Sequence, residues 1–360
     1  MSKLFTPHIE LGLKNRAVMA PMTRCACLPN GNPTPELAEY YIRRAKNEVG
    51  LIIIESAAIN DSTAIGYGNG LQFHHEKHIE AWRPIVKKIQ EAGAKVWIQL
   101  YHAGRLTVKE LANGSPVAPS PIKTWDNASY WRPEQDGQII NFQTKTPYLT
   151  PKELDQGEIN EVISQFAHAC AFAEKAGFDG VELHGAHGYL LHQFLHSETN
   201  KRTDHYNAKS LKFVEELVTK CRNSISNSFT LCYRLSLHMV DNSFIRYDEK
   251  ELDYAPLVQL LDKNGIDVFH SSELKAASPA FGHDLALCEV IRENTKKPII
   301  TCGRISKLKT AEKLLDSKKA DLVAFGRSLI SNPELIANFK NNVDHDFVKF
   351  NYDEHWTPLY

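Results

Sequence analysis

The sequence predicts an α/β fold, a (β/α)8 TIM barrel that forms one domain over residues 1–360. Short apolar runs bounded by turn residues recur along the chain, as expected of buried strands, and helical patterns separate most of them. Strands that alternate with helices form a parallel sheet, and eight is the number of strands that closes into this barrel. No Gly-x-Gly-x-x-Gly motif follows the first run, which disfavours the alternative of an open doubly wound sheet. The eight predicted strands are residues 16–20, 51–55, 96–100, 180–183, 230–235, 267–270, 298–301 and 322–325.

Three of the helical patterns between the predicted strands are the clearest. Residues 159–173 and 79–89 carry apolar side chains at helical spacing, and Gly177 and Gly93 follow them as stop signals. A third helix is expected over residues 254–265. The exception to the regular spacing is the long excursion at about 103–150, rich in Pro, Gly, Ser, Asn and aromatic residues. Such length is typical of functional loops and lids, and we expect the excursion to cover one face of the barrel.

Composition restricts the class of protein. The 42 basic and 43 acidic residues nearly cancel, and no stripe of Lys and Arg is present, which argues against a nucleic-acid partner. No apolar run of transmembrane length occurs and the first residues lack the apolar segment of a secretory signal. The seven cysteines are scattered, and Cys25 and Cys27 have the wrong spacing for a zinc knuckle. We therefore expect a cytoplasmic protein with no membrane association; the oligomeric state is not predicted.

The segment after the fourth predicted strand is the most informative one, since barrel enzymes place their sites at the carboxyl ends of strands. It reads His184-Gly185-Ala186-His187-Gly188-Tyr189. Histidines can donate hydrogen bonds to an anionic oxygen, and a tyrosine is a neutral acid of high pKa that can deliver a proton. On spacing alone His184 and His187 could equally be metal ligands, with His192 and His196 nearby, or ordinary turn residues.

Two further sets of residues occupy strand ends. Gly303-Arg304 follows the seventh strand and Gly326-Arg327 follows the eighth, the positions where barrels often bind phosphate. Gln99 and Arg234 point toward the barrel mouth, where an amide and a guanidinium suit the N1–C2=O edge of a reduced flavin. The alternative for Arg234 is an internal ion pair with Glu55 or Glu182.

Together these motifs resemble those of the old yellow enzyme family, FMN-dependent ene-reductases built on a (β/α)8 barrel. The resemblance covers nearly the whole chain in the right order, and its fourth-strand segment is highly specific. The segments that carry it are residues 19–24, 38–41, 99–102, 184–195, 200–204 and 324–327.

The resemblance implies roles for the site residues. Thr23 matches the residue that hydrogen-bonds the flavin C4 oxygen; one branch of the family has Cys there, which places this chain nearer the Thr-type branch. His184 and His187 match the pair that holds the substrate's carbonyl or nitro oxygen, Tyr189 matches the proton donor, and Tyr101 lines the pocket. The other matched flavin contacts are Pro21, Ser56, Gln99 and Arg234, and the matched phosphate contacts are Gly303, Arg304, Gly326 and Arg327.

The implied reaction is reduction of the activated C=C bond of α,β-unsaturated carbonyl or nitro compounds. The flavin, reduced by NADPH or NADH, supplies hydride from N5, and Tyr189 supplies the proton. Two departures bear on local structure and on substrate range: residues 207–212 lack the family's usual Gly-Gly-Ser and Glu-Asn-Arg, and residues 236–239 replace a more usual Ser-Pro turn. The alternative functions are a flavin-free barrel lyase or isomerase acting on a phosphorylated metabolite, a non-catalytic flavin-binding protein and, last, a metal-dependent hydrolase.

Overall fold

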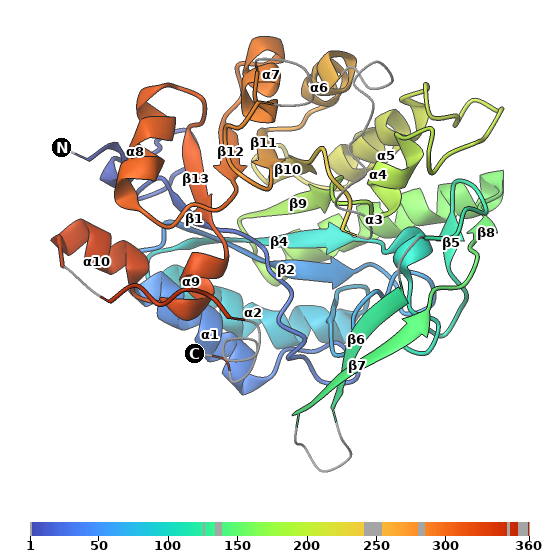
Figure 1. The fold of residues 1–360 in the computed structure, drawn as a ribbon, viewed down its shortest axis with the longest axis horizontal. Helices are drawn as coiled ribbons and strands as arrows, with labels where there is room; N and C mark the ends of the chain where they lie inside the picture. Colours follow the sequence, from blue (N-terminus) through green and yellow to red (C-terminus); the bar gives the residue numbers. More distant parts are fainter. Residues whose placement is uncertain are drawn as a thin grey trace.

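Eight parallel strands close into a barrel in the computed structural model (Figure 1), which describes residues 2–124, 127–133, 139–240, 254–279, 285–343, 346–351 and 359. The strand order is β1-β13-β12-β11-β10-β9-β4-β2, and the pairing of β1 with β2 closes the ring. Each of the eight predicted strands overlaps one of these strands, so the predicted barrel is confirmed. The strands are β1 (Ala17–Met19), β2 (Leu51–Ala58), β4 (Lys95–Tyr101), β9 (Gly180–His184), β10 (Thr230–Leu235), β11 (Val268–Ser272), β12 (Ile299–Cys302) and β13 (Leu322–Phe325), with β3 (Leu71–Gln72) added at the end of β2.

Helices surround the barrel, and local sequence signals set their ends (Figure 1). Asp155 and Glu158 form a capping box at the start of α3, and Gly177 ends that helix with φ 90°, a left-handed conformation that favours glycine. The helices are α1 (Pro35–Lys46), α2 (Glu76–Glu91), α3 (Gln156–Ala176), α4 (Leu190–Phe194), α5 (Lys212–Asn223), α6 (Tyr254–Lys263), α7 (Leu287–Asn294), α8 (Leu308–Asp316), α9 (Arg327–Ser331) and α10 (Leu335–Asn341), with 3-10 turns at Lys3–Phe5 and Gly104–Leu106.

Alternation along the strands produces two apolar cores. On β2, Leu51 and Ile53 belong to a small cluster inside the barrel, together with Trp97 and Val268. Ile52 and Ile54 belong to the larger cluster in which the helices pack on the outside of the sheet. Burial on both faces explains why the barrel strands are continuous apolar runs rather than alternating ones.

The long excursion contains two short sheets. β5 (Val117–Ala118) pairs with β8 (Lys152–Glu153), and β6 (Asn127–Pro133) pairs antiparallel with β7 (Ile139–Pro147). The β6–β7 hairpin extends away from the barrel at the lower edge of Figure 1. Within the described residues, no helix has both the length and the apolar character needed to cross a membrane.

Candidate active site

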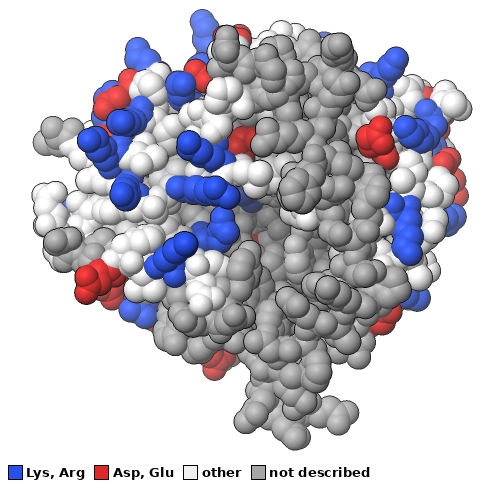
Figure 2. Space-filling view, viewed as in Figure 1, with Lys and Arg blue, Asp and Glu red and all other residues white. Residues whose placement is uncertain are grey.

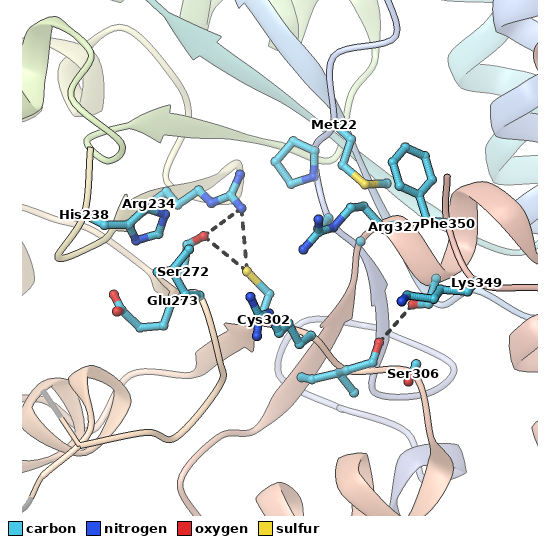
Figure 3. Close-up of a pocket in the computed structure, with 18 of the residues that line it drawn as sticks. Met22, Arg234, His238, Ser272, Glu273, Cys302, Ser306, Arg327, Lys349 and Phe350 are labelled. Atoms are coloured by element: carbon cyan, nitrogen blue, oxygen red, sulfur yellow. Dashed lines mark hydrogen bonds between the residues drawn. The ribbon is translucent and has the colours of Figure 1, made fainter. Parts of the chain in front are cut away.

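A cavity of about 700 Å³ opens at the carboxyl ends of the strands, where barrel enzymes carry their sites (Figure 3). Its walls come from the residues that end or follow β1, β10, β11, β12 and β13, and from residues 347–350 near the end of the chain. Its volume is in the range of cofactor sites. Predicted site residues that line it are Pro21, Arg234, Gly303, Arg304, Gly326 and Arg327.

One end of the cavity is built for close approach to the backbone. Gly303 has φ 143°, and a Cβ atom there would lie 2.4 Å from the Ala276 nitrogen and 2.5 Å from the Glu273 oxygen. Glycine is therefore required at this position.

Cationic side chains lie around this end of the cavity. Arg304 and Arg327 are exposed, and Lys349 joins them from the C-terminal segment. Figure 2 shows a group of Lys and Arg side chains on the face that carries β13 and α9. An anionic group such as phosphate suits this end, although Glu273 also lines the cavity.

The cavity floor is formed by Arg234, Ser272 and Cys302, which contact one another (Figure 3). Arg234 Nη2 donates to Ser272 Oγ at 3.0 Å and to Cys302 Sγ at 3.6 Å. Arg234 is 5% exposed, and its Nε has no hydrogen-bond partner among the described residues. Because an unsatisfied buried donor is costly, this group fits an acceptor on a bound ligand.

Among the described residues, Arg234 forms no ion pair with Glu55 or Glu182, the alternative that the sequence left open. Glu182 instead binds Gln99 Nε2 and His270 Nδ1, both at 2.7 Å. Glu55 accepts hydrogen bonds from the Arg24 backbone at 3.0 Å and from the Tyr41 hydroxyl at 2.9 Å. Burial raises the pKa of Glu55 to about 7.

Three predicted flavin contacts lie outside the cavity lining. Ser56 and Gln99 are hydrogen-bonded to each other, and Gln99 continues to Glu182. They therefore belong to the buried network of side chains that adjoins the cavity floor. Thr23 follows the lining residues Pro21 and Met22 and is partly exposed.

The predicted catalytic residues come together in a histidine–tyrosine cluster formed by His184, His187, Tyr189, Tyr101 and Tyr67. The rings of His184 and His187 are 5.1 Å apart, those of His184 and Tyr189 are 4.8 Å apart, and those of Tyr101 and Tyr189 are 5.3 Å apart.

The cluster is joined to the cavity floor through Ser272. His187 Nε2 lies 3.0 Å from Ser272 Oγ, the same hydroxyl that accepts from Arg234. The turn that places His187 depends on Gly185, because a Cβ atom there would lie 2.1 Å from the Tyr233 ring. His187 itself has φ 61°, an uncommon conformation for a residue with a side chain.

Burial keeps this cluster neutral. Desolvation, and then the positive charge of Arg234, lower the pKa of both His184 and His187 well below 6.5. His184 Nδ1 accepts from the Ala186 backbone at 3.3 Å, which leaves Nε2 as the protonated donor. Burial, and then Tyr67, raise the pKa of Tyr189 well above 10.

Tyr67 is a member of the cluster that the sequence did not reveal. Its hydroxyl is hydrogen-bonded to the hydroxyl of Tyr189. It lies in the loop between β2 and β3, and only its place between two glycines distinguished it in the sequence. His238, Cys302 and Lys349 are further lining residues that no motif indicated.

The neighbouring histidines have structural contacts. His192 is fully buried in α4, its Nδ1 accepts from the Gly188 backbone at 2.9 Å, and its ring packs on His196. Among the described residues, no three or more His, Cys, Asp or Glu side chains are grouped as metal ligands would be. The geometry therefore does not favour the metal-ligand alternative for His184 and His187.

Comparison with known proteins decides the family. The model of the NADH:flavin oxidoreductase / NADH oxidase family matches residues 3–346. The chain belongs to this family. An NADPH dehydrogenase of Clostridium acetobutylicum is 33% identical over 347 residues, which cover 94% of both chains. The chain spans about half the length, 48%, of two other relatives: an NADH oxidase of Thermoanaerobacter brockii, 30% identical over 90% of this chain, and a metal reductase of Desulforamulus reducens, 32% identical over 93% of it.

Solved structures place the chain in the old yellow enzyme family. The old yellow enzyme homologue from Zymomonas mobilis superimposes with a TM-score of 0.82 at 27% identity and covers 99% of this chain and 100% of its own. Morphinone reductase in complex with tetrahydroNAD has a TM-score of 0.82 at 31% identity, covering 95% and 92% of the two chains. The resemblance predicted from the motifs is confirmed. The family description and the names of the relatives agree with the predicted enzyme class, with FMN as the family's cofactor and with a reduced nicotinamide nucleotide as its reductant. The Thr-type branch stays a prediction.

The residues that line the cavity fit FMN. A glycine that tolerates no Cβ and three cations suit the phosphate end. A buried guanidinium whose Nε has no partner among the described residues suits the ring end. The family's cofactor therefore has an appropriate donor set in this chain.

Proposed function

We propose that this protein reduces the activated C=C bond of α,β-unsaturated carbonyl or nitro compounds, with NADPH or NADH as electron donor. The observation that carries the proposal is the position of two neutral histidines and a neutral tyrosine, at the end of β9 beside a cavity suited to FMN. When bound in this cavity, FMN would supply the hydride-transfer chemistry that links oxidation of the nicotinamide to reduction of the alkene. The relatives named 12-oxophytodienoate reductase, 32% identical over 94% of this chain, and morphinone reductase add support.

The cavity residues hold the cofactor in this proposal. Arg234 binds the N1–C2=O edge of the ring through its remaining donor capacity. Thr23 binds the C4 oxygen, and Pro21, Ser56 and Gln99 complete the ring site. The phosphate contacts are the backbone of Gly303 and Gly326 and the side chains of Arg304, Arg327 and Lys349.

His184 and His187 hold the activating oxygen of the substrate. Both are neutral, so each donates a hydrogen bond to the carbonyl or nitro oxygen without supplying a formal charge. Negative charge develops on that oxygen as the β-carbon is reduced, and such a donor contributes about 3 kcal/mol. Tyr101 packs against Tyr189 and limits the space beside the substrate.

Tyr189 protonates the α-carbon. A buried phenol with a raised pKa stays protonated at neutral pH and can donate only to a strongly basic carbon. Tyr67 is a positioning residue, because it orients the Tyr189 hydroxyl through their mutual hydrogen bond.

The visible spectrum of the purified protein tests the proposal. Recorded without oxygen, a flavin spectrum should bleach with NADPH and return on addition of 2-cyclohexenone. A flavin that bleaches but is not reoxidised by alkenes of this class contradicts the substrate assignment. A protein that binds no flavin after incubation with FMN contradicts the cofactor site as well.

The cytoplasm is our proposed location. All seven cysteines are free and buried, which is the expected state in a reducing compartment. Fractionation of cells and immunodetection of the protein test this assignment, and recovery outside the cytoplasm contradicts it.

A further inference from the structure

Cys302 is the last residue of β12 and forms part of the cavity floor (Figure 3). Its sulfur lies 3.3 Å from Ser272 Oγ and 3.6 Å from Arg234 Nη2. Of the seven cysteines it is the one that lines the cavity, and the proposed reduction does not use it.

Cys302 has a buried imidazole–carboxylate pair, His270 and Glu182, on strands of the same barrel. His270 Nδ1 lies 2.7 Å from Glu182 Oε2, and both side chains are fully buried. His270 is on β11, the strand that pairs with β12, two residues before the Ser272 that is in register with Cys302. Its Nε2 has no hydrogen-bond partner among the described residues. A thiol, an imidazole and an orienting carboxylate in this order form the arrangement that activates nucleophilic cysteines. Cys302 belongs to the small cluster inside the barrel and also lines the cavity, so one side of the thiol faces the space in which a ligand would bind.

The charges around Cys302 favour its thiolate. Burial raises the pKa of this thiol, but Arg234 and His270 outweigh that effect and lower it to about 6. Burial raises the pKa of Cys25 and Cys27 and leaves them as thiols. For His270 burial is likewise outweighed, because the Glu182 carboxylate raises the imidazole pKa.

A second observation marks the cavity floor as a ligand site, namely the buried Nε of Arg234, which lacks a partner among the described residues. We propose that Cys302 is a modification site: in flavin-free protein it adds to electrophilic alkenes, and bound FMN covers it. This inference rests on the proposed position of FMN in the cavity. Modification would fill the floor and prevent cofactor binding, so the substrate class would inactivate molecules that have lost FMN.

The reaction is a conjugate addition that needs no redox partner. The sulfur lone pair forms a C–S bond to the β-carbon, and the π electrons of the alkene move onto the α-carbon and its carbonyl. The α-carbon then takes a proton from His270 or from water, and no group leaves. Arg234 is placed to stabilise the thiolate before the bond forms.

Labelling with N-ethylmaleimide in the absence of NADPH tests the inference. The flavin-loaded protein is held at FMN concentrations from half-saturation to large excess, and the labelling rate of each cysteine is measured by peptide mass spectrometry. Cys302 should react at least about tenfold faster than Cys288, whose pKa burial raises to about 11. Its rate should fall in proportion to the fraction of protein without FMN, and labelled protein should fail to quench FMN fluorescence.

Variants at Cys302 and His270 test whether the labelled site and its activation are those proposed. Cys302→Ser should lose the fast-labelled site, and His270→Gln should slow labelling of Cys302 at pH 7. Cys288→Ser, at a cysteine outside the cavity lining, is the matched control and should keep both the fast labelling of Cys302 and the quenching of FMN fluorescence. Equal rates for Cys302 and Cys288, or a Cys302 rate that FMN does not change, would overturn the inference. Since labelling requires no alkene reduction, absence of enone turnover alone contradicts only the proposed function.

Discussion

The cavity floor and the histidine–tyrosine cluster are adjacent, and both contact the Ser272 hydroxyl. The floor favours charged groups, whereas the cluster holds its side chains neutral. At the floor, Arg234 Nε has no hydrogen-bond partner among the described residues, and the positive charge of the guanidinium favours the thiolate of Cys302. In the cluster, burial holds both histidines and Tyr189 neutral. The difference follows from the partners. Arg234 has polar neighbours and an open cavity, whereas the cluster residues pack ring against ring. A charged floor suits cofactor binding, and a neutral cluster suits proton transfer.

The largest expected effect is that of Tyr189→Phe, which should disturb the histidine–tyrosine cluster and leave the cavity floor intact. Tyr189→Phe removes the proton donor and should slow reoxidation of the reduced flavin by 2-cyclohexenone about 10²–10⁴-fold. Bleaching by NADPH should stay largely intact, because that step needs no proton from Tyr189. Stopped-flow absorbance measures both steps. Tyr233→Phe is the matched control, since it removes a buried hydroxyl that has no partner among the described residues. Equal loss in both half-reactions would contradict the assigned role.

The next variant disturbs the cofactor end alone. Gly303→Ala forces a Cβ atom into the Glu273–Ala276 backbone at positive φ, and should weaken FMN binding by about 3 kcal/mol. Fluorescence titration with FMN measures the change, and Gly157→Ala in α3 is a matched control remote from the cavity. Unchanged FMN affinity in the Gly303 variant would remove Gly303 from the phosphate site.

Acid should lower the free energy of unfolding, because buried histidines stay neutral in the folded protein. His192 stays neutral when folded because burial lowers its pKa to about 3, whereas in the unfolded chain it binds a proton below about 6.5. The unfolded state therefore binds more protons in this window, and the free energy of unfolding should fall as pH falls. From pH 6.5 to pH 5 this histidine accounts for about 2 kcal/mol. Urea titrations of the native protein and of His192→Gln measure the slope, and parallel pH profiles would contradict the prediction.

The smallest effect concerns the positioning of Tyr189. Tyr67→Phe removes one hydrogen bond and should slow reoxidation by about tenfold at most, a cost of about 1 kcal/mol. Burial is the main reason that the pKa of Tyr189 is raised, and Tyr67 adds to it. The variant should therefore lose activity at lower pH than the native protein on the alkaline side. A slower reaction with an unshifted alkaline limb would indicate a merely structural role for Tyr67.

Local pattern was sufficient for the barrel. Apolar runs such as residues 51–55 and stop signals such as Gly177 act through neighbours in the chain, and β2 and α3 form where they predict. The strand-end rule then located Arg234, Gly303 and His184 near one another without any knowledge of contacts.

Which side chains face the cavity was decided only in the tertiary structure. Gln99 and Ser56, both predicted flavin contacts, bond to each other because adjacent strands place them side by side, and Gln99 also bonds to Glu182. Tyr67 and Lys349 reach the site from segments that carry no motif, and Cys302 lies directly before the predicted Gly303-Arg304 pair without having been indicated by it. Sequence by itself determined the barrel, its family and the end where the chemistry lies, since these depend on local periodicity and short motifs. The neutrality of the histidines and the charge at the floor depend on burial and on partners distant in the chain, and only the folded structure supplies those.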